Sequence, residues 1–133
     1  MSPDVAFIHQ VTVRFSDTDG MGHVNNSRVL SYVEDARLAF FNTQMPGVME
    51  RGLVVAHVEA DYLRPIEFDR QLRPLDVSVA VGDVGNSSFT IKNEVRQYAE
   101  PAARARVVLV SFDISTGRSA PLTDEQRTAL SSS

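Results

Sequence analysis

Polar side chains that could act on a substrate are concentrated between Ser16 and Asn26, in the sequence SDTDGMGHVNN. Asp17 and Asp19 carry carboxylates, and a carboxylate can take a proton from water or attack an electrophilic carbon itself. The alternative is that both aspartates only hydrogen-bond backbone amides, as aspartate does in turns. Two glycines in the same segment allow the backbone to pass close to a ligand. The residues alone leave a catalytic and a structural interpretation of this loop open.

A long amphipathic helix is predicted directly after the loop, from about Asn26 to Phe41. It is supported by an apolar stripe at helical spacing, made by Val29, Val33, Ala36 and Phe40. The first N–H groups of a helix have no partner within the helix, and the helix dipole adds partial positive charge at that end. We therefore expect the start of this helix to attract a carbonyl oxygen or an anion.

An antiparallel sheet packed on that helix is the architecture that the remaining sequence predicts. Alternating apolar and polar residues indicate strands at 10–15, 53–64, 75–81, 89–96 and 103–112. The last of these is apolar on both faces over Val107–Val110, as expected for a central strand. Residues 115–133 are expected to form a tail that frays at its end. The fold class is therefore α+β, with a five-stranded antiparallel sheet and one long helix.

Length and composition restrict the class of protein. A chain of 133 residues with 43% hydrophobic residues fits one domain, spanning residues 1–133, with a sizeable core. No apolar run is long enough to span a bilayer, and the N-terminal MSPDVAFIHQ lacks the features of a secretory signal, so we expect a cytoplasmic protein without a membrane partner. The formal charge of −4 and the lack of a Lys/Arg cluster argue against nucleic acid as a partner.

Cysteine and histidine usage excludes further kinds of site. The chain has no cysteine, which rules out disulfides, zinc–thiolate sites and a cysteine nucleophile. The three histidines, His9, His23 and His57, do not share a ligand spacing such as i, i+4. We therefore expect neither a metal site nor another cofactor.

The run RFSDTDGMGHVNNSRVLSYVEDAR, from Arg14 to Arg37, resembles the signature of the hot-dog thioesterases of the 4-hydroxybenzoyl-CoA thioesterase type. Three weaker matches follow in the expected order, VEADYLRPIEFD, SSFTIKNEV and VVLVSFDISTGRSAPL. Together they extend from about Val11 to Leu130. The resemblance implies a single hot-dog domain, in which a curved antiparallel sheet wraps round one long helix.

The resemblance also implies roles for residues of the loop. Asp19, the second acid of the Asp-x-Asp motif, matches the family's functional carboxylate and is expected to act as base or nucleophile. The backbone N–H of Asn26 is the implied donor that polarises the thioester carbonyl. His23 is a third catalytic candidate, expected to bind substrate or to stabilise the loop. The alternative is that it is an ordinary loop histidine without a catalytic role. Gly22 and Asn25 are substrate-binding candidates, although Asn25 could simply cap the helix.

Two carboxylates on the predicted helix are alternatives to Asp19 as the catalytic carboxylate. Another lineage of hot-dog thioesterases carries its catalytic carboxylate on the central helix, which makes Glu34 and Asp35 candidates by resemblance. In this sequence Glu34 and Arg37 lie at i, i+3, and a surface ion pair is the simpler interpretation.

A coenzyme A substrate needs its phosphates held by arginine or lysine. Some relatives carry basic residues just before the Ser-Phe of the SSFTIKNEV match, where this chain has GNS. Ser87, Ser88 and Arg64 are substrate-binding candidates here, and Arg70 and Lys92 are further basic ones. An acyl group on a carrier protein is an alternative substrate.

The leading hypothesis is an acyl-CoA thioesterase, a hydrolase that splits an acyl-CoA or acyl-carrier thioester into a carboxylic acid and a free thiol. The alternative is a catalytically silent hot-dog domain that binds an acyl thioester or serves as an assembly unit. A hydratase or dehydratase shares the fold, but the Asp-x-Asp loop with GHVNN argues against it. Because a small sheet leaves strand edges unpaired, we expect a homo-oligomer, either a dimer or a homotetramer.

Overall fold

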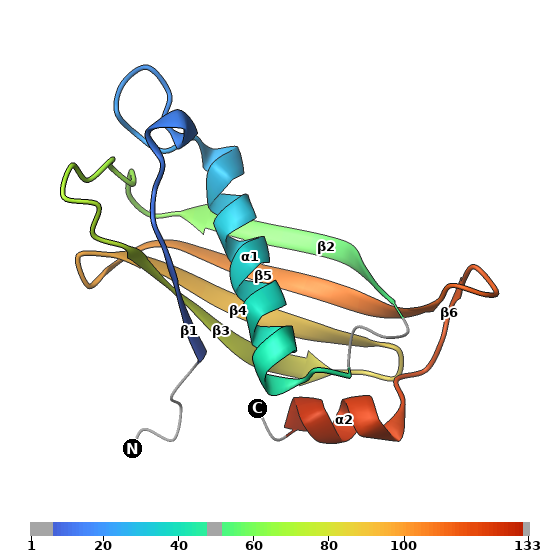
Figure 1. The fold of residues 1–133 in the computed structure, drawn as a ribbon. Helices are drawn as coiled ribbons and strands as arrows, with labels where there is room; N and C mark the ends of the chain where they lie inside the picture. The colour runs from blue at the N-terminus through green and yellow to red at the C-terminus, as the bar shows by residue number, and fades with distance from the viewer. Residues whose placement is uncertain (1–6, 48–51, 132–133) are drawn as a thin grey trace.

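The computed structural model describes residues 7–47 and 52–131 and shows one sheet with a long helix against one of its faces (Figure 1). The strands are β1 (Phe7–Val11), β2 (Leu53–Tyr62), β3 (Leu75–Val84), β4 (Ser88–Gln97), β5 (Glu100–Asp113) and β6 (Arg118–Ser119). The helices are α1 (Asn26–Gln44), α2 (Asp124–Ser131) and the short 3-10 helix η1 (Phe15–Asp17).

The sheet has the strand order β1-β3-β4-β5-β2, and every described pairing within it is antiparallel. The two-residue strand β6 pairs with β5 off this path. The predicted α+β arrangement, five main strands with one long helix, is therefore confirmed. Strand β5 lies between β4 and β2, as expected for a segment that is apolar on both faces.

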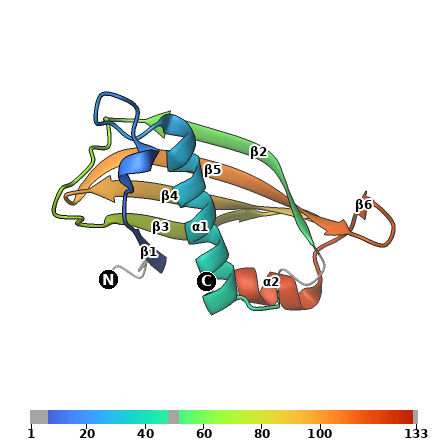
Figure 2. The same ribbon diagram turned by 45° about the horizontal axis from the view of Figure 1, so that its top comes forward.

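Helix α1 buries one side against the sheet because its apolar residues recur at helical spacing. The buried residues are Val29, Tyr32, Val33, Ala36, Phe40 and Phe41. The helix crosses the sheet over β1, β3 and β4, and Phe41 meets Phe89 of β4 edge to face with ring centroids 6.1 Å apart. Figure 2 shows the same relation from above the helix start. Strand β2, at the far edge, is covered least.

Strand β2 contains a bulge that changes which side chains share a face. Val55 is opposite Leu109 and His57 is opposite Val108, so Ala56 is an extra residue. Opposite residues lie on the same face, and Leu109 belongs to the core. The alternation over residues 53–64 predicts Val54 and Ala56 on the face of Tyr62. That assignment is wrong before the bulge, where Val55 takes the inward position instead.

The first strand and the end of the chain also differ from the prediction. The strand lies at Phe7–Val11 rather than at residues 10–15, and Phe15 begins η1 with 72% of its surface exposed. The predicted tail contains a helix, α2, opened by a reciprocal cap between Thr123 and Gln126. Leu130 buries this helix against the core, which an unstructured tail would not do. No helix in the described ranges is long and apolar enough to cross a membrane.

Candidate active site

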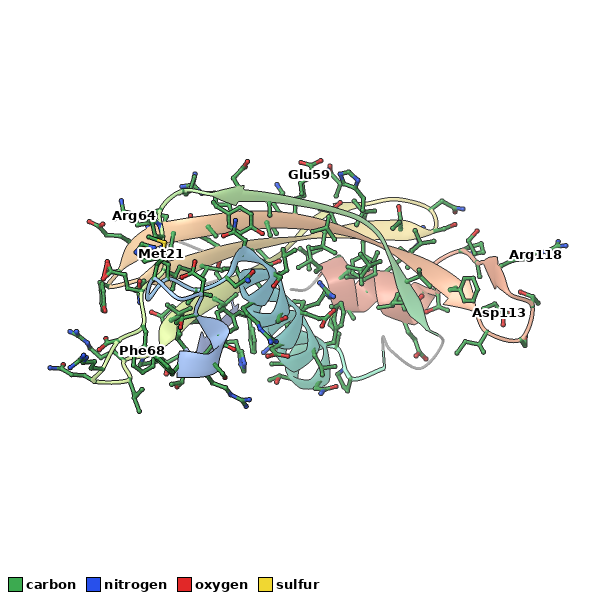
Figure 3. The ribbon with its side chains drawn as sticks, turned by 90° about the horizontal axis from the view of Figure 1, so that it is seen from above. Met21, Glu59, Arg64, Phe68, Asp113 and Arg118 are labelled. Carbon is green, nitrogen blue, oxygen red and sulfur yellow. The ribbon has the colours of Figure 1, made fainter. Side chains whose placement is uncertain are left out.

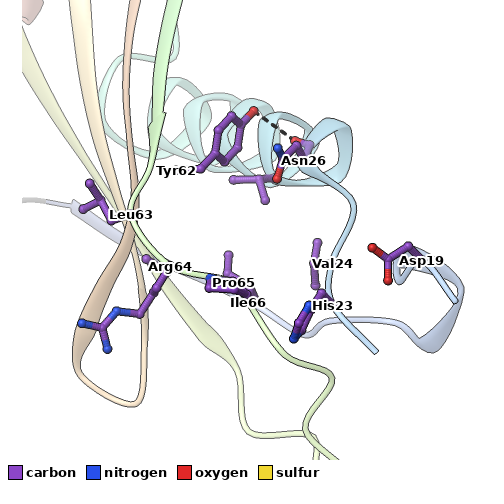
Figure 4. A pocket seen from close by; sticks show the side chains of 11 residues that line it. Asp19, His23, Val24, Asn26, Tyr62, Leu63, Arg64, Pro65 and Ile66 are labelled. Carbon is purple, nitrogen blue, oxygen red and sulfur yellow. Dashed lines mark hydrogen bonds between the residues drawn. The ribbon is translucent and has the colours of Figure 1, made fainter. Parts of the chain in front are cut away.

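A pocket of about 370 Å³ opens between the start of α1 and the end of β2 (Figure 4). The loop before α1 forms one wall, and the segment that follows β2 forms the other. The pocket is lined by Asp19, His23, Val24, Asn26, Val29, Tyr62, Leu63, Arg64, Pro65, Ile66 and Ala102. All three catalytic candidates from the sequence, Asp19, His23 and Asn26, therefore line one pocket.

The loop that carries Asp19 is a compact turn. The Asp19 N–H donates to the carbonyl of His23 at 2.8 Å, and Gly22 takes a φ of +82°, which favours glycine. One carboxylate oxygen of Asp19, Oδ1, accepts the N–H of Met21 at 2.8 Å, while no described residue donates a hydrogen bond to Oδ2. Figure 4 shows the carboxylate turned toward the pocket. Asp19 therefore makes the predicted turn contact through Oδ1 and still has Oδ2 available to a substrate or water.

Asp17 has a different environment, because its carboxylate is buried between the loop and α1. Its Oδ2 accepts the Tyr32 hydroxyl at 2.6 Å and the Arg14 N–H at 3.1 Å. Asp17 is 8% exposed and does not line the pocket. Burial, followed by the hydrogen bond to Asp17, raises the pKa of Tyr32 above its ordinary value, so this hydroxyl stays a donor at neutral pH.

The start of α1 presents a backbone donor to the pocket. The Asn25 side chain caps the helix, since its Oδ1 accepts the N–H of Ser27 at 3.0 Å. The capping interpretation of Asn25 is confirmed, and the residue does not line the pocket. Asn26 is the first residue of α1, and in the described part of the chain its backbone N–H has no acceptor. An unpaired N–H at a helix start is suited to binding a carbonyl oxygen.

His23 lies on the pocket wall opposite β2, half-buried. A backbone bridge pairs it with Glu67, and the neighbouring Val24 N–H donates to the Ile66 carbonyl at 2.8 Å. Gly22 is exposed and accepts the Phe68 N–H at 3.2 Å through its carbonyl, but it does not line the pocket. These bonds attach the loop to the segment after β2. The two walls of the pocket are therefore joined by backbone hydrogen bonds.

Tyr62 and Ile66 are pocket residues that the sequence reasoning missed. The Tyr62 hydroxyl donates to the Asn26 carbonyl at 3.2 Å, the dashed line in Figure 4. The segment VEADYLRPIEFD resembles the family, but apart from the substrate-binding candidate Arg64 its residues are predicted only to form a strand interrupted by Pro65. The available signal was an aromatic residue three positions before Pro65, because the last side chains of a strand lie at the end of the sheet.

Arg64 lines the pocket but its guanidinium pairs with the carboxylate of Glu100. Figure 4 shows it directed away from Asp19 and Asn26. In this conformation the Arg64 guanidinium lies at the mouth of the pocket, apart from Asp19 and Asn26.

Ser87 ends the turn between β3 and β4, and Ser88 is the first residue of β4, at the other end of the sheet. Ser88 is opposite Val110 of β5, and Val110 is in turn opposite Val54, near the start of β2. The pocket residue Tyr62 is at the other end of β2. Eight strand positions correspond to about 25 Å. Figure 3 shows the two ends of the molecule, with Met21 and Phe68 at one end and Asp113 at the other. Substrate contact by these serines remains a prediction, and it would need a second subunit.

Glu34 and Arg37 form the predicted i, i+3 ion pair, with 3.8 Å between Nη2 and Oε2. Burial lowers the pKa of Arg37, and Glu34 partly offsets this effect. Glu34 and Asp35 line a separate, mainly apolar pocket of about 270 Å³ beside β2. Glu34 is about 12 Å along the helix from Asn26, so the helix carboxylates lie away from the free N–H. The described residues contain no group of three or more His, Cys, Asp or Glu that could hold a metal ion.

Comparison with known proteins places the chain in a family. Residues 13–130 match the model of the thioesterase-like superfamily. The uncharacterized protein YsmA of Bacillus subtilis (strain 168) is 33% identical, over 94% of this chain and 85% of its own length.

Two solved structures share both fold and sequence with this chain. A predicted thioesterase from Bacillus stearothermophilus is 32% identical with a TM-score of 0.85, covering 95% of this chain and 94% of its own. A thioesterase from Thermus thermophilus, solved with coenzyme A and Zn, is 38% identical with a TM-score of 0.83, covering 94% of this chain and 92% of its own. These relatives support thioester hydrolysis as the class of activity. The chain belongs to the thioesterase-like superfamily and has its hot-dog fold.

Proposed function

We propose that this protein hydrolyses acyl-CoA thioesters to a carboxylic acid and free coenzyme A. One observation carries the proposal: a single pocket contains an open carboxylate oxygen of Asp19 and the unpaired backbone N–H of Asn26. Thioester hydrolysis needs both parts, a donor for the carbonyl oxygen and a carboxylate that attacks or activates water.

Two routes fit this arrangement. In the first, Asp19 attacks the thioester carbon, the C–S bond breaks, and water then hydrolyses the acyl–aspartyl anhydride. In the second, Asp19 takes a proton from water as the water attacks the carbon, and the C–S bond breaks afterwards. In both, one water is consumed, its oxygen enters the acid and a proton reaches the leaving thiolate. The Asn26 N–H binds the carbonyl oxygen as negative charge develops on it, and one such donor typically contributes about 10²–10³ in kcat.

Coenzyme A is the proposed thiol carrier because the Thermus relative was solved with it. Arg64 at the pocket mouth is the proposed phosphate contact, with a phosphate replacing Glu100 on its guanidinium. Asn25 and Gly22 are proposed to act through the shape of the loop, since neither lines the pocket. His23 is proposed to contact the substrate from the loop wall.

The proposed assembly is a homodimer formed along β2. This strand pairs with β5 on one side, and its other edge has no strand partner among the described residues. Val55 and Val58, on its inward face, are 41% and 44% exposed. Antiparallel pairing of two β2 edges would satisfy the open edge and cover these side chains.

Incubation with a panel of acyl-CoA thioesters, from acetyl-CoA to long-chain and aromatic acyl-CoA, tests the proposal by colorimetric detection of the released thiol. The wild-type protein is expected to release thiol, and Asp19→Asn is expected to release it about a hundredfold or more slowly. Glu34→Gln is the matched control, because it removes a carboxylate from the helix without touching the pocket. Binding of acyl-CoA without thiol release would instead support a silent hot-dog domain.

A further inference from the structure

The Asp17 carboxylate, outside the pocket, contacts three residues, one before η1 and two in α1. It accepts hydrogen bonds from the Tyr32 hydroxyl in the second turn of α1 and from the Arg14 N–H before η1. The Arg28 guanidinium lies 3.9 Å from its other oxygen. Asp17 and Tyr32 are both buried, at 8% and 5% exposure. A buried carboxylate is expected to be paired, and here the pairing crosses from the loop to the helix.

The Asp17 backbone makes a fourth connection, to the start of α1. Its carbonyl accepts the Asn25 N–H at 2.9 Å. The next residue, Thr18, bridges to Val24 and begins the turn that presents Asp19. One residue therefore contacts the helix start through its backbone and the second helical turn through its side chain, and it is two positions from the pocket carboxylate.

We infer that Asp17 and Tyr32 are positioning residues, which set where the Asp19 carboxylate lies relative to the Asn26 N–H. The inference rests on the proposed function, in which these two groups must act on one carbonyl. Neither Asp17 nor Tyr32 lines the pocket, so both act through the loop. A displacement of about 1 Å between catalytic groups can lower a rate by about 10²-fold. The loop contains two glycines and is exposed around Asp19, and the Asp17 contacts restrict its movement.

Tyr32→Phe removes one hydroxyl, keeps the ring in the core, and is the main test. We expect kcat to fall about tenfold, with KM within about twofold. The matched control is Tyr98→Phe, which removes a tyrosine hydroxyl that interacts with another aspartate, Asp69, outside the pocket. Tyr98→Phe is expected to keep the wild-type kcat.

A double-mutant cycle separates positioning from loss of stability. In the Asp19→Asn background there is no carboxylate left to position, so Tyr32→Phe is expected to have little further effect on kcat. A variant that only reduces the folded fraction would lower kcat by the same factor in both backgrounds. Equal factors in the two backgrounds, or a wild-type kcat for Tyr32→Phe, would overturn the inference while leaving the proposed function intact.

Backbone amide hydrogen exchange gives a readout that does not need activity. Tyr32→Phe is expected to speed exchange of the Asn25 amide, which donates to Asp17, and Tyr98→Phe is not. If the wild-type protein hydrolyses no acyl thioester, the proposed function fails, and faster Asn25 exchange would still support positioning of the helix start. Unchanged exchange in Tyr32→Phe would contradict it.

Discussion

The hydroxyl of Tyr62, the last residue of β2, donates a 3.2 Å hydrogen bond to the carbonyl of Asn26, the first residue of α1. Thirty-six residues separate the two in sequence. This contact brings the sheet edge to the helix start and forms the pocket wall opposite the Asp19 loop. The catalytic proposal and the following predictions depend on this junction.

Asp19→Asn is expected to lower kcat by about a hundredfold or more, because it keeps the size of the side chain but removes the charge needed of a base or nucleophile. KM should stay nearly unchanged. Steady-state thioesterase kinetics provide the measurement. Asp17→Asn should cost less, since Asp17 acts outside the pocket. A wild-type rate in Asp19→Asn would transfer the role to another carboxylate, with Glu34 first in line.

Asn26→Pro is expected to be far more damaging than Asn26→Ala. Alanine keeps the backbone N–H and proline removes it, while proline is tolerated in the first helical turn. We expect a loss of about 10²-fold or more in kcat for proline and a small loss for alanine. Circular dichroism and light scattering must show both variants folded and assembled as the wild type. Equal losses would assign the role to the Asn26 side chain.

Tyr62→Ala is expected to raise KM more than Tyr62→Phe. The ring forms part of the pocket wall, whereas the hydroxyl makes one long hydrogen bond at an exposed position. Such a bond contributes about 0.5–1.5 kcal/mol at most, which corresponds to roughly tenfold or less. Kinetics with one acyl-CoA across the three proteins tests the order. A larger effect for Tyr62→Phe would show that the hydroxyl contacts the substrate.

Val58→Lys is expected to convert a dimer to a monomer, because it places a charge on the exposed inward face of β2. Light scattering at micromolar concentration measures the mass. Ile114→Lys is the control, since Ile114 is 73% exposed and lies beyond the end of β5. A wild-type protein that is already monomeric would contradict both the proposed dimer and an active site shared between subunits.

Stability is expected to fall at alkaline pH, with Tyr32 as one cause. Burial and the Asp17 hydrogen bond raise the pKa of Tyr32 above its ordinary value of 10.0. The unfolded chain therefore loses this proton first, and stability declines as pH rises through 10 toward the higher folded value. One such group changes the free energy of unfolding by up to about 1.4 kcal/mol per pH unit. Thermal unfolding between about pH 8 and 11 should show a weaker decline in Tyr32→Phe.

The sequence alone predicted the elements whose signals are local. The stripe from Val29 to Phe40 indicated α1, and the polar loop before it located Asp19, His23 and Asn26 at a helix start. Antiparallel strands followed from period-two alternation. These features can be recognised from residues that lie within a few positions of one another in the sequence. The resemblance then selected Asp19 over Asp17, and the pocket is consistent with that selection.

Contacts between distant segments could not be read from the sequence. Asp17 is buried because Tyr32 is fifteen residues away on the helix face above it, and no local pattern distinguishes it from Asp19. Tyr62 and Ile66 reach the pocket because antiparallel pairing carries the end of β2 back to the helix start. The bulge at Ala56 likewise depends on the partner strand. Sequence periodicity determines which face of an element is apolar, whereas packing against other elements determines which polar groups remain open to a substrate.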